Sequence, residues 1–331
     1  MRTWFRPIRW GAAALAVCLG TAAPGAAAQV PLKDVAVGHG LAAPAENGRR
    51  VVLRSAYSTL AFEPNTRRLF YNDLLIYLNA PVLGGSGRWT VAECDAKSVI
   101  GALLRRDQAL ASSGCGTIVL DPGHGGEDSG TLTRHGVAEK KLVLDIARRV
   151  ASKLEGCGVT VYLTRDRDRF VTLEERSRIA GYVHGDLFVS IHANASRDPA
   201  VSGLETFVTP AQGFPSTTSD EPGRLGQTAH AGNRFEAENL LLAYYLHRGL
   251  VSYAAGGDRG IKRARYQVLR DAPCPAALVE CGFLSNRTEA DKLDSRSYRD
   301  LVADALARGI MTYVSNVNEA RYGQHYACVV K

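Results

Sequence analysis

From Thr117 onward, apolar strands and amphipathic helices alternate along the chain, and this alternation is the feature that most constrains the fold. Such an order builds a mostly parallel, twisted sheet with helices on both faces. We expect strands at 117–121, 159–164, 187–192, 204–208, 266–269 and 276–280. We expect helices at 139–155, 173–182, 236–253 and 298–314. The predicted fold class of this part is therefore α/β.

The N-terminal residues 1–28 have the pattern of a secretory signal peptide. They combine three arginines and an apolar run with three alanines just before Gln29. The apolar run is shorter than the roughly 20 residues that a membrane span needs. We therefore expect an exported protein with no stable membrane span after cleavage, most simply periplasmic and otherwise secreted or wall-associated.

Between this segment and the alternating region, the pattern indicates a smaller unit. Residues 29–50 show no periodicity and are expected to be a flexible lead-in. Residues 51–113 predict a small α+β domain, with short strands around turns at 64–65 and 79–81 and an amphipathic helix at 95–110. The larger α/β domain is expected at 114–316, followed by a C-terminal tail at 317–331. No chemical cluster falls within 51–113.

Charge and cysteines limit the partners and the kind of metal site. The net charge of +7 falls to +4 once the three N-terminal arginines are removed, a mild excess that suits an anionic partner such as a cell wall. No basic stripe interleaved with aromatics indicates nucleic acid. The six remaining cysteines form no CxxC pair. Cys274 and Cys281 flank one predicted strand, about 23 Å apart when extended, which is too far for a disulfide.

Four residues at the ends of apolar runs carry the chemistry. They are His124 in TIVLDPGHGG, Glu139 at the start of a predicted helix, His192 in DLFVSIHANAS and Glu280 in AALVECGFLSN. Three of them follow or end predicted strands, whose carboxyl ends meet at one edge of a parallel sheet. Two imidazoles and one carboxylate can hold a zinc ion, and a second carboxylate can transfer protons. The set predicts metal-assisted hydrolysis of an amide.

Each of these residues also has a simpler interpretation. His124 could be a surface histidine in a glycine-rich turn, and His192 a core histidine with its hydrogen bonds satisfied. A helix N-terminus favours an acid such as Glu139 through its dipole. Glu280 ends a predicted central strand, where a charge is costly unless it has a partner or a function. The competing residues for the metal role are Glu127, Asp128 and His135. The arginines that could simply pair with Glu280 are Arg263, Arg265 and Arg270.

The order of these motifs resembles the zinc-dependent N-acetylmuramoyl-L-alanine amidases of the type-3 amidase group. The resemblance covers residues 117–314 through VLDPGHGGEDSG, EKKLVLDIARRV, LTRDRD, LEERSRIA, LFVSIHANAS and DRGIKRARYQVLRDAPCPAALVECGFLSN. It implies that His124, Glu139 and His192 bind zinc and that Glu280 is the catalytic glutamate. The implied reaction releases stem peptides from peptidoglycan, and 114–316 would be the catalytic domain.

The chain departs from this family in two places. Gly181 stands where many members have asparagine, and residues 210–238, rich in proline and glycine, disfavour the long self-inhibiting helix that some members carry. A long blocking helix is therefore not expected, although residues 232–238 could form a short one. The sequence does not show whether an occluding segment or an activating protein regulates the enzyme. The segment NDLLIYLNAPVLGGSGRWTV resembles small domains related to the copper amine oxidase N-terminus, which implies wall binding but no copper.

Further residues have weaker assignments. Asn194, Arg259 and Lys262 are candidate substrate-binding residues, since the two cations could meet an acidic stem peptide. We expect Arg165, Asp166 and Arg176 to tie the sheet edge to its neighbours rather than to contact substrate. Two other functions remain open: a zinc peptidase that cuts within the stem peptide, and a wall-binding protein without activity.

Overall fold

The computed structural model describes residues 28–85, 87–219, 221, 223–254, 256–323 and 330. The expected signal peptide lies outside these residues, except for Ala28. Among the described helices, none combines the length and the apolar character that a bilayer crossing requires.

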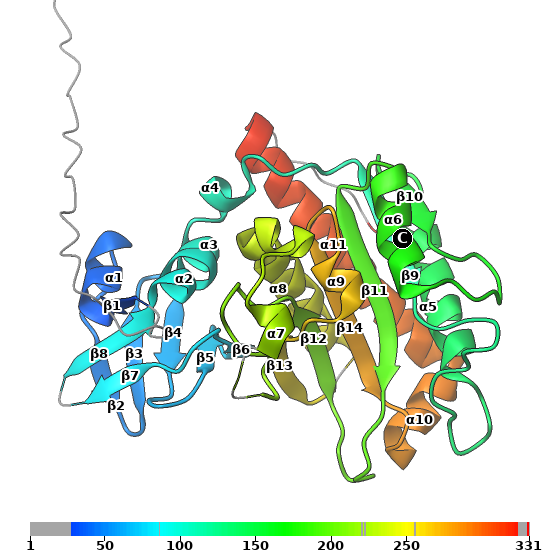
Figure 1. Cartoon of the computed structure of the whole chain (residues 1–331), viewed down its shortest axis with the longest axis horizontal. Coiled ribbons are helices and arrows are strands. Elements are labelled where there is room, and N and C mark those ends of the chain that lie inside the picture. The colour runs from blue at the N-terminus through cyan, green and yellow to red at the C-terminus, as the bar shows by residue number, and fades with distance from the viewer. Residues whose placement is uncertain are drawn as a thin grey trace, which may run out of the picture.

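The strands form one large sheet of eleven strands and one small sheet of three within the described part of the chain (Figure 1). The order in the large sheet is β10-β9-β11-β14-β12-β13-β6-β5-β4-β3-β2, and in the small sheet β1-β8-β7. The bounds in the first half are β1 (Gln29–Pro31), β2 (Ala45–Asn47), β3 (Arg50–Arg54), β4 (Thr59–Phe62), β5 (Arg68–Tyr71), β6 (Leu74–Tyr77), β7 (Leu83–Gly85) and β8 (Arg88–Ala92). Those in the second half are β9 (Thr117–Pro122), β10 (Thr160–Leu163), β11 (Leu187–Asn194), β12 (Leu204–Val208), β13 (Asp258–Arg263) and β14 (Ala276–Phe283).

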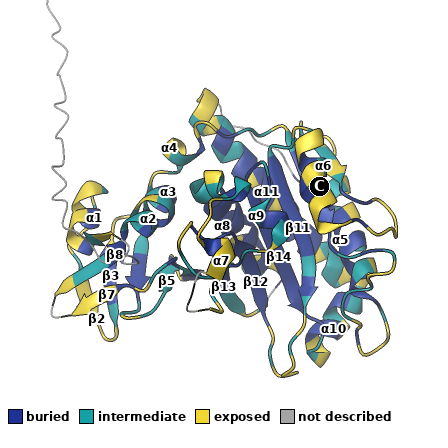
Figure 2. Cartoon of the chain, viewed as in Figure 1, coloured by how far each residue is buried: buried dark blue, intermediate teal, exposed yellow. Residues whose placement is uncertain are grey.

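The part of the large sheet built after Thr117 is mostly parallel, as predicted. Strands β10, β9, β11 and β14 run parallel to one another, and β12 pairs parallel with β13. Only the β12–β14 pair is antiparallel in this part. Strands β11, β12 and β14 are buried along most of their length (Figure 2), which explains why they read as continuous apolar runs.

Helices cover both faces of this sheet, and the α/β prediction is confirmed. Helices α5, α8 and α11 share the larger hydrophobic core on one face, while α6 and α9 pack over a smaller core on the other. The helices are α1 (Leu32–Gly38), α2 (Glu93–Asp95), η1 (Ala96–Gly101), α3 (Ala102–Leu104), α4 (Arg106–Leu110), α5 (Glu139–Leu154), α6 (Leu173–Tyr182), α7 (Gly223–Gly226), η2 (Ala231–Phe235), α8 (Glu236–Tyr253), α9 (Gln267–Arg270), α10 (Arg287–Asp294) and α11 (Arg296–Tyr322).

One predicted strand is wrong. Residues 267–269 belong to the short helix α9, for which Tyr266 is the N-cap, and the strand of this region is β13, which begins at Asp258. The sequence DRGIKR of β13 carries four charges and does not look like a buried strand. Most of its charged groups are paired with other parts of the fold. Arg259 and Lys262 pair with Glu205, and Nε of Arg263 donates to the Tyr77 carbonyl, while Nη2 of Arg263 is buried without a hydrogen-bond partner among the described residues.

The expected lead-in at 29–50 contains regular structure, which corrects the prediction for this segment. Strand β1 pairs antiparallel with β8, and α1 buries Leu32, Val35 and Ala36. Strand β2 extends the edge of the large sheet through β3. Elements of three to seven residues are shorter than the windows in which periodicity can be read, so the sequence pattern does not reveal them.

The N-terminal strands continue the large sheet. Strand β6 lies parallel to β13, with Ile76 opposite Ile261. The Leu75 amide donates to the Asp258 carboxylate at 2.9 Å across this junction. The structure therefore joins residues 45–77 to the α/β part through backbone pairing, in addition to side-chain contacts.

The last helix runs further than expected. Helix α11 continues to Tyr322, so the first residues of the expected tail at 317–331 are helical. It ends at Gly323, whose φ of +63° is the left-handed C-terminal cap that glycine adopts without strain. Buried Val317 explains the extension, because it prolongs the contact of α11 with the core.

The cysteines agree with the spacing argument. Cys274 and Cys281 are both free thiols, as are Cys94 and Cys115, and Cys157 is held in a disulfide.

Candidate metal centre and catalytic cleft

His124 lies in a tight turn directly after β9. It has a φ of +58°, in the left-handed region that non-glycine residues rarely adopt. The preceding Gly123 donates its amide to the Ile191 carbonyl at 3.0 Å and packs against the ring of His192. A Cβ atom at position 123 would lie 2.1 Å from that ring. Glycine is therefore needed where β9 and β11 bring the two histidines together.

Glu139 is the first residue of α5 and is only 3% exposed. Its Oε1 lies 3.0 Å from Nε2 of His124 and 3.1 Å from Nδ1 of His192. The carboxylate also accepts hydrogen bonds from the amides of Thr131 and Ala193. Burial acts to raise the pKa of Glu139, but the hydrogen bonds of the two imidazoles hold it well below its ordinary value. The carboxylate is thus ionised beside both histidines.

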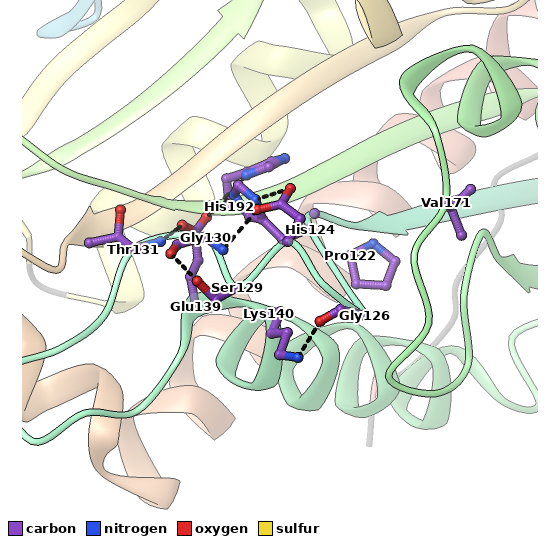
Figure 3. A network of polar contacts seen from close by, with 12 residues as sticks. Pro122, His124, Gly126, Ser129, Gly130, Thr131, Glu139, Lys140, Val171 and His192 are labelled. Atoms are coloured by element: carbon purple, nitrogen blue, oxygen red, sulfur yellow. Dashed lines mark hydrogen bonds and ion pairs between the residues drawn. The ribbon is translucent and has the colours of Figure 1, made fainter.

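His124, Glu139 and His192 form one cluster (Figure 3), and their ligand atoms lie within 4.8 Å of one another. The structure brings together the three residues that the sequence analysis named as ligands. Two imidazoles and one carboxylate are a donor set that catalytic zinc sites use, with a further position left for water. The residues present therefore fit a zinc ion.

Asp128 has a supporting place beside the cluster. Its Oδ2 lies 2.8 Å from Nδ1 of His124, the ring nitrogen opposite the one that faces Glu139. Metal-binding imidazoles commonly use their second nitrogen in this way, which fixes the ring orientation. Burial acts to lower the pKa of His124, but hydrogen bonds and charge from Glu139 and Asp128 raise it above its ordinary value. The sequence placed Asp128 among the rival ligands.

The two other candidates for the metal role lie outside the cluster. Glu127 is exposed, and His135 contacts Asp291 at 3.2 Å.

Glu280 adjoins the cluster from β14. It is paired in register with His192 on β11 and with Glu205 on β12. It is 8% exposed, and its Oε2 is buried without a hydrogen-bond partner among the described residues. Burial, together with the charges of Glu139 and Glu205, raises its pKa well above the ordinary value. A buried carboxylate with an unused oxygen beside a metal cluster is suited to accept a proton.

The simpler interpretation of Glu280 as half of an ion pair finds no support in the described residues. Arg263 donates to the Tyr77 carbonyl, Arg265 to the carbonyls of Ala211 and Phe214, and Arg270 pairs with Asp271.

Two buried arginines hold the turn that carries His124. Arg165 donates to the carbonyls of Pro122 and Gly123 at 2.9 and 2.6 Å. Arg176 donates to the carbonyls of Pro122 and His124 at 2.9 and 2.8 Å. Both side chains are at most 3% exposed. Every backbone carbonyl from Pro122 to His124 is thus bound by a guanidinium, which stabilises the strained turn.

Asp121 compensates the charge of these arginines. It is fully buried, accepts a 2.7 Å ion pair from Arg176 and hydrogen bonds from Thr164 and Ser190. Burial and the neighbouring Arg176 lower the pKa of Arg165 to about 10, so it stays protonated at neutral pH. These contacts agree with the expectation that Arg165 and Arg176 tie the sheet edge together.

A cleft of about 490 Å³ opens over the cluster. Its floor includes His124, His192 and Glu280, and its sides are formed by segments around α6 and α9. Large side chains from both sides line it: Phe170, Val171, Leu173, Tyr266 and Val268. A concave, largely apolar site with a few convergent polar groups is the usual form of a small-ligand site.

Asn194, Arg259 and Lys262 converge on Glu205 in this structure. Arg259 Nε lies 2.7 Å and Lys262 Nζ 2.5 Å from Glu205 Oε1, and Asn194 Nδ2 donates to Oε2 at 3.0 Å. Their assignment as substrate-binding residues stays a prediction. The residue that sequence reasoning missed is Glu205, although its position inside the apolar run LETFV is the same signal that singled out Glu280.

Comparison with known proteins agrees with this geometry. LytC of Bacillus subtilis (strain 168), an N-acetylmuramoyl-L-alanine amidase, is 35% identical over 197 residues, which are 60% of this chain and 35% of LytC. The amidase AmiA of Escherichia coli (strain K12) is 32% identical over 232 residues, 63% of this chain and 79% of AmiA. The chain thus spans about a third of the length of LytC and most of AmiA.

A solved structure gives the same result for the fold. The N-acetylmuramoyl-L-alanine amidase AmiC2 of Nostoc punctiforme superposes with a TM-score of 0.51 at 36% identity, covering 61% of this chain and 98% of AmiC2. The family model of the N-acetylmuramoyl-L-alanine amidases, Amidase_3, matches residues 118–312 and so includes the cluster and Glu280. Because this match covers more than half of the chain, the protein belongs to the Amidase_3 family of N-acetylmuramoyl-L-alanine amidases.

Proposed function

We propose that this protein hydrolyses the amide between the lactyl group of N-acetylmuramic acid and L-alanine in peptidoglycan, with zinc as its cofactor. The observation that carries the proposal is the convergence of His124, Glu139 and His192 beside the buried Glu280. Family membership supports the choice of substrate. The products are a glycan that carries a free lactyl carboxylate and a stem peptide with a free amine.

The three clustered residues are proposed to hold the metal. Asp128 orients the ring of His124 through its contact with Nδ1, and the amide of Ala193 helps to orient the carboxylate of Glu139. The chemistry that zinc supplies in such a site is to lower the pKa of a water molecule to about 7 and to polarise a carbonyl.

Glu280 is proposed to move the protons. Its Oε2, which has no hydrogen-bond partner in the described part of the chain, can accept a proton from the attacking water and return it to the leaving amine of L-alanine. Its raised pKa makes the carboxylate a stronger base than an exposed glutamate. The neighbouring Glu205 forms ion pairs with Arg259 and Lys262, whose positive charges compensate its own. Glu280 and Glu205 are therefore not an uncompensated pair of negative charges.

The cellular setting follows from the N-terminal sequence and the substrate. We propose export by the signal peptide at 1–28 and action in the periplasm, with peptidoglycan as the partner. Residues 114–316 are proposed as the catalytic domain, and 51–113 as a smaller unit built onto the edge of its sheet.

The proposal is tested by incubating the purified mature protein with sacculi, with and without a zinc chelator, and by mass spectrometry of the soluble products. Release of intact stem peptides only without the chelator is the expected result. Fragments cut within the stem would instead indicate a peptidase. An absence of any product from zinc-loaded protein would contradict the enzymatic proposal unless a protein activator restores release.

A further inference from the structure

A second hollow in the surface continues from the catalytic cleft. This hollow, here called the α6 groove, has a volume of about 920 Å³. It is lined by Val171, by one side of α6 including Gly181 and Tyr182, and by residues at and after α9 including Gln267 and Pro273. Val171 and Gln267 line both the groove and the catalytic cleft. A ligand held over Glu280 can therefore extend into the groove without leaving the surface.

The groove follows the axis of α6 away from the metal cluster. Leu173, at the start of α6, lines the catalytic cleft, and Tyr182, at its end, lines the groove. Nine residues of α-helix separate these two side chains by about 13 Å. This length exceeds that of one sugar ring, so the groove suits an extended or polymeric ligand.

The lining of the groove and cleft suits a neutral ligand with many hydroxyl groups. Exposed aromatic side chains lie along the path, with Tyr182 88% exposed, Phe170 47% and Tyr266 42%. Such rings offer an apolar face, and a tyrosine adds a polar tip. Gln267 adds a side-chain amide that can both donate and accept hydrogen bonds.

The charges of the groove argue against the acidic stem peptide as its occupant. The lining contains three acids and two arginines: Glu174, Glu175, Asp271, Arg169 and Arg178. Several of these are already engaged, since Glu175 caps α6 through Thr172 and Asp271 pairs with Arg270 at 2.7 Å. The groove therefore presents no excess of positive charge to peptide carboxylates.

We propose that the α6 groove is a glycan subsite, which binds sugar residues of the strand next to the N-acetylmuramic acid whose amide is cut. The inference rests on the proposed function, because it takes the substrate to be peptidoglycan. A glycan subsite in this groove makes the protein selective for polymeric strands over single muramoyl peptides.

Gly181 allows the groove to be filled without strain. It is a helical residue of α6, and a Cβ atom there would meet only Pro273 Cγ, at an ordinary contact distance of 3.7 Å. Replacing a helical glycine by leucine also favours the helix. Gly181→Leu should therefore fold well and narrow the groove, while Tyr182→Ala removes its most exposed ring. Tyr57→Ala is the matched control, because Tyr57 is 91% exposed on the N-terminal unit.

The first measurement is independent of hydrolysis. Fluorescently labelled glycan strands without peptides are titrated into the full mature chain and into each variant. Tyr182→Ala should raise the dissociation constant about fivefold to tenfold, the loss expected for one aromatic contact. Gly181→Leu should also raise it, because the added side chain occupies part of the groove, whereas Tyr57→Ala should leave it unchanged. Equal affinities in all four proteins would overturn the glycan subsite, whether or not the protein is an amidase.

The second measurement compares substrates. For each variant, kcat/KM is measured on uncrosslinked strands bearing stem peptides and on a single muramoyl peptide. The ratio of the first value to the second should fall about fivefold to tenfold in each groove variant. The fall should come mainly from a higher KM for the strands. A loss that instead grows with the length of the stem peptide would assign the groove to the peptide and overturn the proposal. If the wild-type protein cleaves neither substrate, the proposed function fails. The binding titration alone then tests whether the groove binds glycan.

Discussion

His192 and Glu280 occupy paired positions on two neighbouring parallel strands, β11 and β14. This register places a candidate zinc ligand and a candidate proton carrier side by side at the carboxyl edge of the sheet. Glu139 reaches the same point from the first turn of α5. Because the proposed proton carrier is not one of the proposed zinc ligands, substitutions of Glu280 and His192 should affect zinc binding and turnover differently.

Glu280→Gln should reduce kcat by about 10²- to 10⁴-fold, because the amide cannot accept the proton that general-base catalysis requires. Zinc content should stay near one per chain, since Glu280 is not among the three clustered donors. Steady-state kinetics and elemental analysis of the same preparation measure both quantities. Glu127→Gln changes an exposed carboxylate near His124 and serves as the control. Full activity in Glu280→Gln would show that the proton carrier is another group.

His192→Ala should lose zinc as well as activity, because it removes one of the three donors. Elemental analysis after dialysis against zinc-free buffer measures the metal that remains bound. His135→Ala tests a rival imidazole that contacts Asp291 instead, and we expect it to retain zinc. If His192→Ala kept its zinc and His135→Ala did not, the ligand assignment would be reversed.

Arg176→Lys should weaken zinc binding about tenfold to a hundredfold, the range seen when groups that support metal ligands are altered. The lysine keeps the positive charge near Asp121 but cannot bind the carbonyls of Pro122 and His124 together, as the guanidinium does. Competition with a chromogenic chelator measures the zinc dissociation constant, and thermal unfolding of the zinc-free protein reports folding separately.

Arg165→Lys should act in the same direction, since Arg165 holds the carbonyls of Pro122 and Gly123. Arg148→Lys is the control, because Arg148 is exposed and donates to the Asp166 carbonyl outside the turn. Unchanged zinc affinity in both Arg165→Lys and Arg176→Lys would mean that the turn holds its shape without them.

Asp258→Asn should destabilise the fold by about 1–3 kcal/mol near neutral pH, the size of a hydrogen bond to a charged group. Asp258 contacts buried His247 at 2.9 Å and accepts the Leu75 amide across the β6–β13 junction. Urea unfolding at pH 7 measures the difference. Asp73→Asn, at an exposed turn position where asparagine is also tolerated, is the matched control.

The pH dependence of this effect has a defined sign. Burial acts to raise the pKa of Asp258, but the hydrogen bond and charge of His247 hold it below its ordinary value. A carboxylate with a lowered folded-state pKa contributes stability above about pH 4 and loses it as the pH falls through the folded-state value. The difference between wild type and Asp258→Asn should therefore shrink in unfolding experiments at pH 3. A difference that grows on acidification would contradict this assignment.

Much of the catalytic part could be predicted because its signals are local. The apolar runs that end at His192 and Glu280 are strands whose hydrophobic residues are contiguous in sequence. Parallel strands end at a common edge, so their terminal polar residues could be expected to meet. Glu139 required the family resemblance, because an acid at a helix N-terminus has a sufficient local explanation.

Other features depend on pairing across long sequence separations. Strand β13 looks polar, and its charges are tolerated at the centre of a sheet because partners from other segments meet them. Glu205 pairs with its cations, and His247 and the Leu75 amide contact Asp258. The α6 groove likewise arises where α6 and the segment after α9 come to lie side by side.

By itself the sequence determined the α/β class, the order of the motifs and the three candidate residues at strand ends, His124, His192 and Glu280, because hydrophobic periodicity and strand ends are local properties of the chain. The tertiary structure decided which charges neutralise one another, how Arg165 and Arg176 hold the His124 turn, and that the N-terminal strands extend the catalytic sheet. These features rest on contacts between residues far apart in sequence, whose partners are selected only when the whole chain packs.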